Sequence, residues 1–307
     1  MIPTVSVVIP THAPHAGRLA RTLVGLQAQS LPREQWELVI IDNRSPTPVA
    51  LDLGWHPAAR VVREERLGLT NARLAGGAAT QGEVLVFVDD DNVLATNYLE
   101  VVANLFAGHP RLGAAGGKSL PEWEIAPEGW VQEFAGTLAL RDLGNDQQVV
   151  GPEVKGYPSC APVGAGMAIR RSAWTAYADS VNRDATAPSD RTGGELTSGG
   201  DNDIVLRILR AGWEVGYFPQ LSLSHLIPAG RLSREYLARL NHGIAKSWVQ
   251  VLDRHGIRPW PPAPRWQVAL RKWRAYLHYR AWRGPAEYIR WKGACGQFEG
   301  RGLIRNR

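Results

Sequence analysis

A buried strand that runs into three consecutive carboxylates constrains this chain more than any other feature. Residues 84–88 are all apolar and three of them are valine, a composition typical of a strand covered on both faces of a sheet. Asp89, Asp90 and Asp91 follow at once, and burying them is costly unless a cation or donor groups offset their charge. Oxygen ligands suit Mg²⁺ or Mn²⁺, which leave coordination positions for substrate phosphates. The alternative is an acidic loop that caps the next helix.

The chain before this stretch alternates between strand and helix patterns. Strands are predicted over residues 5–9, 36–41 and 60–63, and helices over 17–29 and 68–78. This order is typical of an α/β fold with a doubly wound, mainly parallel sheet, in which ligands bind beyond the carboxyl ends of the strands. No Gly-x-Gly-x-x-Gly follows the first strand and no P-loop motif is present. Dinucleotide dehydrogenases and P-loop NTPases are therefore disfavoured.

Four segments together resemble family 2 glycosyltransferases, the inverting enzymes of the GT-A fold. They are residues 6–11 (SVVIPT), 39–45 (VIIDNRS), 68–73 (GLTNAR) and 87–91 (FVDDD). The resemblance covers about residues 4–250. It implies a Rossmann-like GT-A domain over residues 1–255, a hexosyltransferase-type activity and a nucleotide-sugar donor, which we expect to be UDP-linked.

The resemblance also implies a donor pocket and a metal site. Asp42 would accept a hydrogen bond from the nucleotide base, Thr11 and Arg73 would line the same pocket, and Asp90 would lie near the ribose. The alternatives are that Asp42 caps a turn, that Arg73 is a solvated helix residue and that any small polar residue could replace Thr11.

For the metal, Asp89 and Asp91 match the family's Asp-x-Asp pair, and His225 lies where several GT-A enzymes place a histidine ligand. The alternative is that His225 is a structural residue. The implied ion is Mn²⁺ or Mg²⁺.

A second acidic segment opens the helix predicted over residues 201–211. Asp201 follows two glycines, and its simplest role is that of a helix N-cap. Its match to the family's Glu-Asp-x-Asp pattern implies instead the catalytic base that deprotonates the acceptor hydroxyl. The chain departs from the family in two places: Gly200 stands where Glu is usual and Gly166 where Asn is usual.

The last part of the chain, residues 256–307, predicts a basic helical extension. Residues 258–307 contain 12 Lys/Arg and 2 Asp/Glu, a net charge of +10, whereas the other 257 residues contain 23 and 27, a net charge of −4. Trp266, Leu270 and Trp273 share one helical face. Such a helix either lies on anionic lipid, giving peripheral membrane contact through residues 265–292, or packs its tryptophans on the catalytic domain. Nucleic acid is not an expected partner.

The remaining composition predicts a cytoplasmic protein, peripheral at the inner face of the membrane. No apolar run approaches 18 residues, the first residues lack a secretory signal pattern, and the two cysteines are far apart. The predicted function is transfer of a sugar to a hydroxyl of a glycan or lipid-linked acceptor, as in polysaccharide biosynthesis of the cell envelope. Two rivals stay open: a degenerate transferase that only binds nucleotide sugar or glycan, and a metal-dependent phosphatase.

Overall fold

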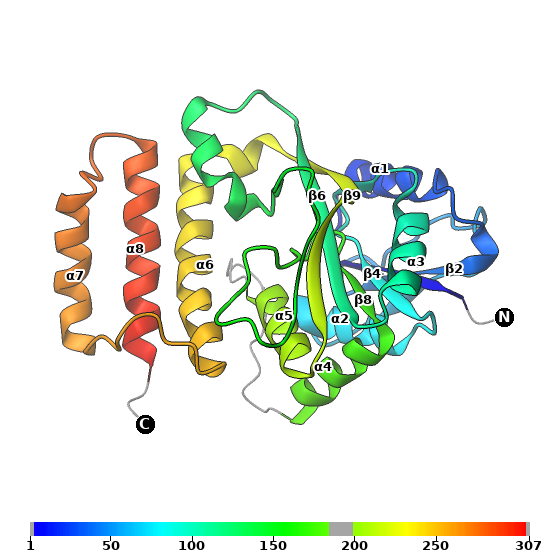
Figure 1. Cartoon of the computed structure of the whole chain (residues 1–307). Coiled ribbons are helices and arrows are strands. Elements are labelled where there is room, and N and C mark those ends of the chain that lie inside the picture. The colour runs from blue at the N-terminus through cyan, green and yellow to red at the C-terminus, as the bar shows by residue number, and fades with distance from the viewer. Residues whose placement is uncertain (1–2, 184–198, 305–307) are drawn as a thin grey trace. The chain divides into compact units, whose positions relative to one another are not determined.

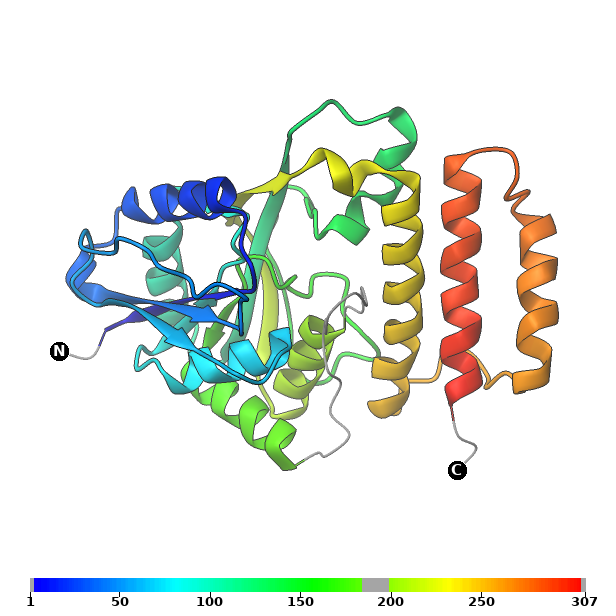
Figure 2. The same cartoon turned by 180° about the vertical axis from the view of Figure 1, so that it is seen from behind.

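The computed structural model describes residues 3–183 and 199–304, which belong to two compact units (Figures 1 and 2). Of the described residues, the first unit contains 3–122, 139–183 and 204–226, and the second contains 123–138, 199–203 and 227–304. The helix that ends just before residue 255 packs with the C-terminal helices, and the predicted domain boundary at that residue stays a prediction. Within the described residues, no helix is both long enough and apolar enough to cross a bilayer.

A mixed sheet forms the centre of the first unit, and nine strands lie within the described residues. The strands are β1 (Val5–Thr11), β2 (Trp36–Asp42), β3 (Ala59–Arg63), β4 (Val84–Phe87), β5 (Asn92–Leu94), β6 (Leu112–Trp123), β7 (Gln148–Val150), β8 (Ala168–Arg170) and β9 (Glu214–Ile227). Their order is β3-β2-β1-β4-β8-β6-β9-β5, with β7 also paired to β9. Strands β1 to β4 are mutually parallel, and β8 and β9 pair antiparallel with their neighbours. The predicted α/β class is confirmed. Antiparallel strands widen the mainly parallel sheet that the sequence predicts.

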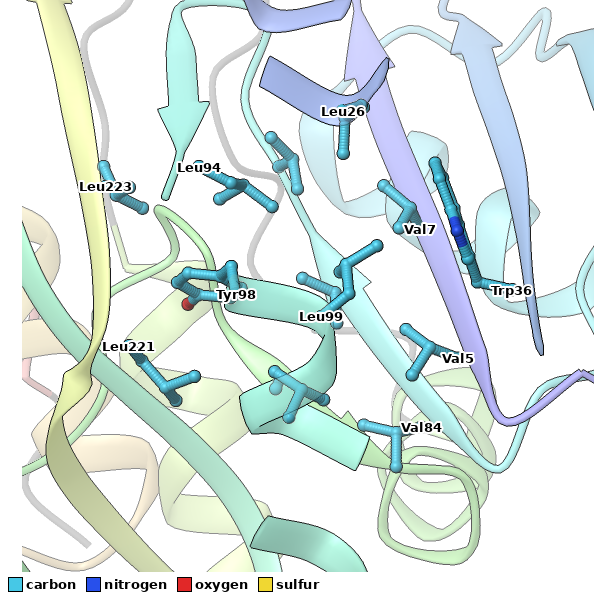
Figure 3. Packing of buried hydrophobic residues seen from close by; sticks show 14 of the residues in the cluster. Val5, Val7, Leu26, Trp36, Val84, Leu94, Tyr98, Leu99, Leu221 and Leu223 are labelled. Carbon is cyan, nitrogen blue, oxygen red and sulfur yellow. The ribbon is translucent and has the colours of Figure 1, made fainter. Parts of the chain in front are cut away.

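Helices cover both faces of this sheet, so it is doubly wound as predicted. They are α1 (Ala16–Gln27), α2 (Leu69–Ala78), α3 (Tyr98–Gly108), α4 (Arg171–Arg183) and α5 (Gly200–Arg210). The 3₁₀ helix η1 (Arg33–Gln35) belongs to the same unit, and the 3₁₀ helices η2 (Gly129–Leu138) and η3 (Ala229–Leu232) belong to the second unit. Alternate residues of β1 enter opposite layers: Val7 packs with α1 and α3, and Val8 packs with α2, α4 and α5. Figure 3 shows the first of these layers around Val7, Leu26 and Leu99.

Helix α2 lies close to its neighbours because two of its four buried residues, Gly76 and Gly77, are glycines. An added Cβ at Gly76 would collide with Val8 of β1, and one at Gly77 would collide with the indole of Trp174 on α4. Larger residues at these two positions would therefore push α2 outward.

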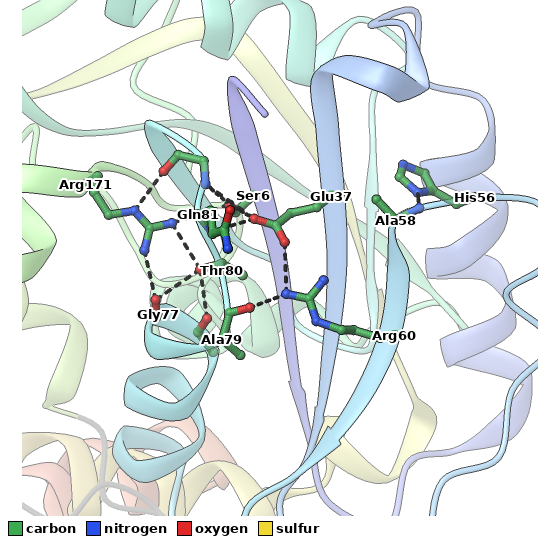
Figure 4. A network of polar contacts seen from close by, with 12 residues as sticks. Ser6, Glu37, His56, Ala58, Arg60, Gly77, Ala79, Thr80, Gln81 and Arg171 are labelled. Atoms are coloured by element: carbon green, nitrogen blue, oxygen red, sulfur yellow. Dashed lines mark hydrogen bonds and ion pairs between the residues drawn. The ribbon is translucent and has the colours of Figure 1, made fainter. Parts of the chain in front are cut away.

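A polar network closes the amino-terminal end of the same sheet (Figure 4). The buried carboxylate of Glu37 accepts hydrogen bonds from Ser6 Oγ at 2.8 Å, Gln81 N at 2.6 Å, Arg60 Nη2 at 3.0 Å and Gly82 N at 3.3 Å. These donors come from β1, from β3 and from the turn before β4. The network therefore fixes the turn that leads into the acidic strand.

The second unit is built around three helices, α6 (Arg234–Arg254), α7 (Arg265–His278) and α8 (Pro285–Leu303). Helix α8 packs against both α6 and α7 and lies between them (Figure 1). Glycines on α8 face α6, and an added Cβ at Gly296 would collide with the carbonyl oxygen of His242. The two helix backbones therefore approach closely, which is why α6 belongs with the C-terminal helices.

Candidate active site

Strand pairing brings His225 beside the acidic cluster at the carboxyl end of the sheet. Strand β5 begins directly after the three aspartates and runs antiparallel to β9, with Asn92 opposite His225. The backbone N–H of Leu226 donates to the carbonyl of Asp91 at 2.9 Å. As a result, Nε2 of His225 lies 3.4 Å from Oδ1 of Asp91, and each side chain is only 5% exposed. Two residues that are distant in the sequence thus form one buried pair.

The chemistry and spacing of this pair fit a divalent ion. Two neighbouring ligands of an octahedral ion at about 2.1 Å lie about 3 Å apart, close to the observed separation of Asp91 and His225. Among residues 3–183 and 199–304, no group of three or more His, Cys, Asp or Glu residues forms a complete metal cluster. The pair therefore suits an ion that takes further ligands from substrate phosphates. The role of Asp89 as a ligand stays a prediction.

Thr11, Asp42 and Asp90 lie at the same edge of the sheet. Thr11 is the last residue of β1 and stands opposite Asp42, the last residue of β2. The hydroxyl of Thr11 donates to Oδ2 of Asp90, which follows the neighbouring strand β4. The structure therefore gathers three of the four predicted donor-pocket residues beside the metal-binding candidates. Their contacts with a nucleotide stay predictions.

The Asp42 carboxylate makes hydrogen bonds within its own chain. Its Oδ1 accepts from Ser45 N at 2.9 Å, and its Oδ2 accepts from Val49 N at 3.2 Å and from Arg63 Nη1 at 2.8 Å. Burial alone would raise the pKa of Asp42, but the hydrogen bonds from Ser45, Val49 and Arg63 outweigh it and lower that pKa. Asp42 thus organises the turn after β2, as the capping alternative expects. Arg63 was not identified from the sequence, because nothing local links it to Asp42.

Arg73 is buried in α2, so the alternative of a solvated helix residue is wrong. Its guanidinium carbon lies 5.9 Å from the ring centroid of Phe87, the last residue of β4. A cation over an aromatic face is favourable, more so away from water. Arg73 is therefore held over the ring of Phe87, two residues before Asp89, where the sequence alone could not place it.

Asn43 is a residue of this region that sequence reasoning missed. Its Oδ1 accepts from the N–H of Gly68 at 2.8 Å, and its Nδ2 donates to the carbonyl of Arg66 at 2.8 Å. Asn43 therefore holds the loop that leads into α2 and positions the start of the helix that carries Arg73. Its place immediately after Asp42 at a strand end was the available signal.

The departure at Gly166 has a steric cause. Gly166 has a φ of 72°, and an added Cβ would lie 2.6 Å from Cδ2 of Leu223 and 2.7 Å from Oη of Tyr98. The hydroxyl of Tyr98 donates to the carbonyl of Gly166 at 2.6 Å, and burial raises the pKa of this tyrosine. In this chain the space for the usual Asn is therefore occupied by Tyr98.

Asp201 lies in the first turn of α5, on the part of that helix that belongs to the second unit. Two residues further on, the buried carboxylate of Asp203 lies 2.7 Å from Nε2 of His255, which follows α6. An added Cβ at Gly199 would lie 2.9 Å from Cγ2 of Val251, so the backbone before Asp201 also runs close to α6. These contacts hold the helix start that carries Asp201. Its role as base stays a prediction.

A comparison with family models identifies the family of this chain. The family model described as glycosyl transferase family 2 matches residues 6–174. Polypeptide N-acetylgalactosaminyltransferase 10 of Rattus norvegicus and that of Mus musculus are each 29% identical over 104 residues. These matches cover 32% of this chain and only 17% of each relative.

Solved structures of the S. aureus protein TarS show a similar fold. The crystal structure of TarS 1–349 matches with a TM-score of 0.53 and 14% identity, over 97% of this chain and 90% of that chain. The structure of TarS 1–349 in complex with UDP matches with a TM-score of 0.52, at the same identity and coverage. At this identity the likeness establishes the fold.

Proposed function

Since the chain belongs to glycosyl transferase family 2 and is a glycosyltransferase, we propose that it moves a sugar from a UDP-linked donor to an acceptor hydroxyl with inversion at the anomeric carbon. The observation that carries the proposal is the buried Asp91–His225 pair at the ligand-binding end of the sheet. The choice of uridine is supported by the UDP complex of TarS, whose fold is similar. Membership of this family leaves the phosphatase alternative without support.

The donor would bind at the carboxyl ends of β1, β2 and β4. The proposed ligands of Mn²⁺ or Mg²⁺ are Asp89, Asp91 and His225, and the proposed nucleotide contacts are Thr11, Asp42, Arg73 and Asp90. When bound, the ion offsets the negative charge that develops on the leaving diphosphate. A nucleotide base that hydrogen-bonds to the Asp42 carboxylate would replace one of the donors that now bind it.

The acceptor hydroxyl would lose its proton to Asp201. As that oxygen forms a bond to the anomeric carbon, the bond from this carbon to the diphosphate oxygen breaks on the opposite face, and the diphosphate leaves with the electron pair. Asp203 and His255 would act as positioning residues, because they hold the first turn of α5. One carboxylate is sufficient for this displacement.

The acceptor that we propose is a glycan or a lipid-linked glycan, as in cell-envelope polysaccharide biosynthesis. The enzyme would act in the cytoplasm, at the inner face of the membrane, with contact through residues 265–292. A second candidate function follows from Gly200: without the usual Glu before Asp201, the chain could retain donor binding and lack transfer.

Turnover of a panel of UDP-sugars with Mn²⁺ tests these proposals. Wild type should transfer or slowly hydrolyse one donor, and Asp201→Asn should lower transfer by about 10²–10⁴-fold, the usual loss for a catalytic base. UDP binding should be unchanged in this variant. Asp146→Asn, an exposed aspartate in a loop, is the matched control and should behave as wild type. If wild type binds UDP but turns over no donor, the chain functions as a binding protein and not as a transferase.

A further inference from the structure

An apolar stripe on helix α7 is left exposed by the rest of the described chain. Trp266 is 75% exposed, Trp273 is 60% exposed, and Leu270 and Leu277 are also exposed. Their spacing of four, three and four residues places them on one face of the helix. Trp282 in the turn after α7 is exposed as well. In the described residues, these side chains therefore form one exposed apolar stripe.

The opposite face of α7 is already used for packing against α8. Ala275 is buried, the rings of Tyr276 and Trp291 meet at 5.1 Å, and the indole N–H of Trp291 donates to the carbonyl of Lys272 at 3.0 Å. Helix α8 is enclosed between α6 and α7, as Figures 1 and 2 both show. Residues 285–292 of the predicted membrane contact therefore have packing partners, and the available surface narrows to α7 and the turn after it.

This surface is positive. Residues 265–283, which form α7 and the turn after it, contain no Asp or Glu. They contain six basic residues: Arg265, Arg271, Lys272, Arg274, Arg280 and Arg283. Arg274 and Arg280 are exposed beside the apolar stripe, and Lys272 pairs with Glu299 on α8. The partner of this surface must therefore be apolar at its centre and anionic around it.

We infer that the outer face of α7, together with Trp282, is a docking surface for an anionic lipid membrane. Tryptophan and leucine would enter the boundary between headgroups and acyl chains, while the arginines contact lipid phosphates. A second copy of the same face would bring arginine against arginine, which disfavours self-association. Helix α7 has 14 residues, about 21 Å in length, so it would lie on a bilayer whose core is about 30 Å thick.

The physiological purpose of this docking rests on the proposed function, because it would hold the enzyme near a lipid-linked acceptor. The binding itself does not depend on turnover. It is measured with the full chain and vesicles, without donor or acceptor.

Vesicle flotation tests the inference, with phosphatidylcholine alone and with phosphatidylcholine mixed with phosphatidylglycerol. Wild type should bind the anionic vesicles and only weakly the neutral ones. The double variant Arg274→Gln/Arg280→Gln should bind anionic vesicles about thirtyfold more weakly, and Arg111→Gln, the charge control on an exposed arginine, should bind as wild type.

A second pair of variants tests the apolar stripe. Trp266→Ala/Trp273→Ala should lose at least about tenfold in vesicle binding at an unchanged melting temperature, because both side chains are exposed. Ile125→Ala, which truncates an exposed apolar residue elsewhere, is its control. Turnover with a soluble acceptor should be the same in all variants.

Several results would overturn the inference. They are equal vesicle binding by wild type and both double variants, a dimer in light scattering that the tryptophan variant abolishes, and binding of short nucleic acids that the arginine variant abolishes while vesicles are ignored. Vesicle binding without any turnover would instead contradict the proposed function alone.

Discussion

The two ends of the central sheet place buried carboxylates in different surroundings. At the amino end, Glu37 receives donors from the neighbouring strands and from the turn before β4, including the cation of Arg60. At the carboxyl end, Asp91 is adjacent in sequence to two further aspartates and faces His225 at 3.4 Å. A buried carboxylate that accepts hydrogen bonds from neighbouring strands and turns, as Glu37 does, stabilises the framework. Carboxylates concentrated beside a histidine at the ligand-binding end instead favour an external cation.

The largest expected difference between the two ends is in catalysis. Asp91→Asn should lower kcat/KM by about 10³-fold, or about 4 kcal/mol of transition-state stabilisation, because the proposed ion would lose a ligand. Steady-state turnover of the UDP-sugar with Mn²⁺ measures this. Glu37→Gln should keep near-normal turnover per folded molecule. If both variants lose activity equally at unchanged stability, the proposed functional distinction between the two ends is wrong.

The next largest effect should be on stability, and it should come from the amino end of the sheet. Glu37→Ala should lower the free energy of unfolding by about 3 kcal/mol, since it leaves the buried donors of Ser6 and Gly82 and the part-buried donor of Gln81 without their acceptor. Urea denaturation measures the change. Glu34→Ala, which truncates an exposed glutamate in η1, is the control and should change the free energy little. A loss below about 1 kcal/mol for Glu37→Ala would show that the network is not a main support of this edge.

Metal binding should separate the two ends without any turnover. Saturating Mn²⁺ with UDP should stabilise wild type by about 2.7 kcal/mol at a hundredfold excess over the dissociation constant. The corresponding rise in melting temperature should disappear in His225→Asn and persist in Glu37→Gln. Persistence of the full rise in His225→Asn would remove this residue from the proposed metal site.

The pH dependence of stability should report the amino end. Burial would raise the pKa of Glu37, but hydrogen bonds from Gln81, Ser6 and Arg60 lower it below its ordinary value of 4.5. A lowered folded-state pKa stabilises the protein above the unfolded-state value, and this contribution is lost as pH falls from 4.5 through the folded-state value. Urea denaturation across this range should give a flatter profile for Glu37→Gln, and identical profiles would contradict the assignment.

The smallest effect should come from substituting Arg63, which donates a hydrogen bond to Asp42 at the carboxyl end of the sheet. Its side chain is about one-third exposed, so Arg63→Gln should lower the free energy of unfolding only slightly. UDP affinity, measured by calorimetry, decides the role of Asp42. An unchanged affinity in both Arg63→Gln and Asp42→Asn would place Asp42 with Glu37 as a framework residue. A large loss in Asp42→Asn alone would place it in the donor pocket.

Much of the parallel half of the fold could be predicted from local patterns. The apolar runs that became β1, β2 and β4 and the spacing that became α1 are properties of neighbouring residues, so the sequence displays them directly. The antiparallel half was harder. Residues 213–219 and 221–225 have the pattern of two strands, whereas β9 is one long strand from Glu214 to Ile227. Its continuity depends on pairing with other strands, which local periodicity does not contain.

The candidate site divides in the same way. The sequence by itself determined the order of strands and helices, the acids after β4, and the placement of tryptophans and cations on different faces of α7. Each of these is a pattern of residues close together in the chain. Only the tertiary structure decided that His225 meets Asp91, that Arg73 is buried over Phe87 and that the tryptophans of α7 are exposed. Those outcomes depend on strand register and helix packing between residues far apart in the chain. Such contacts form only when the whole chain has folded.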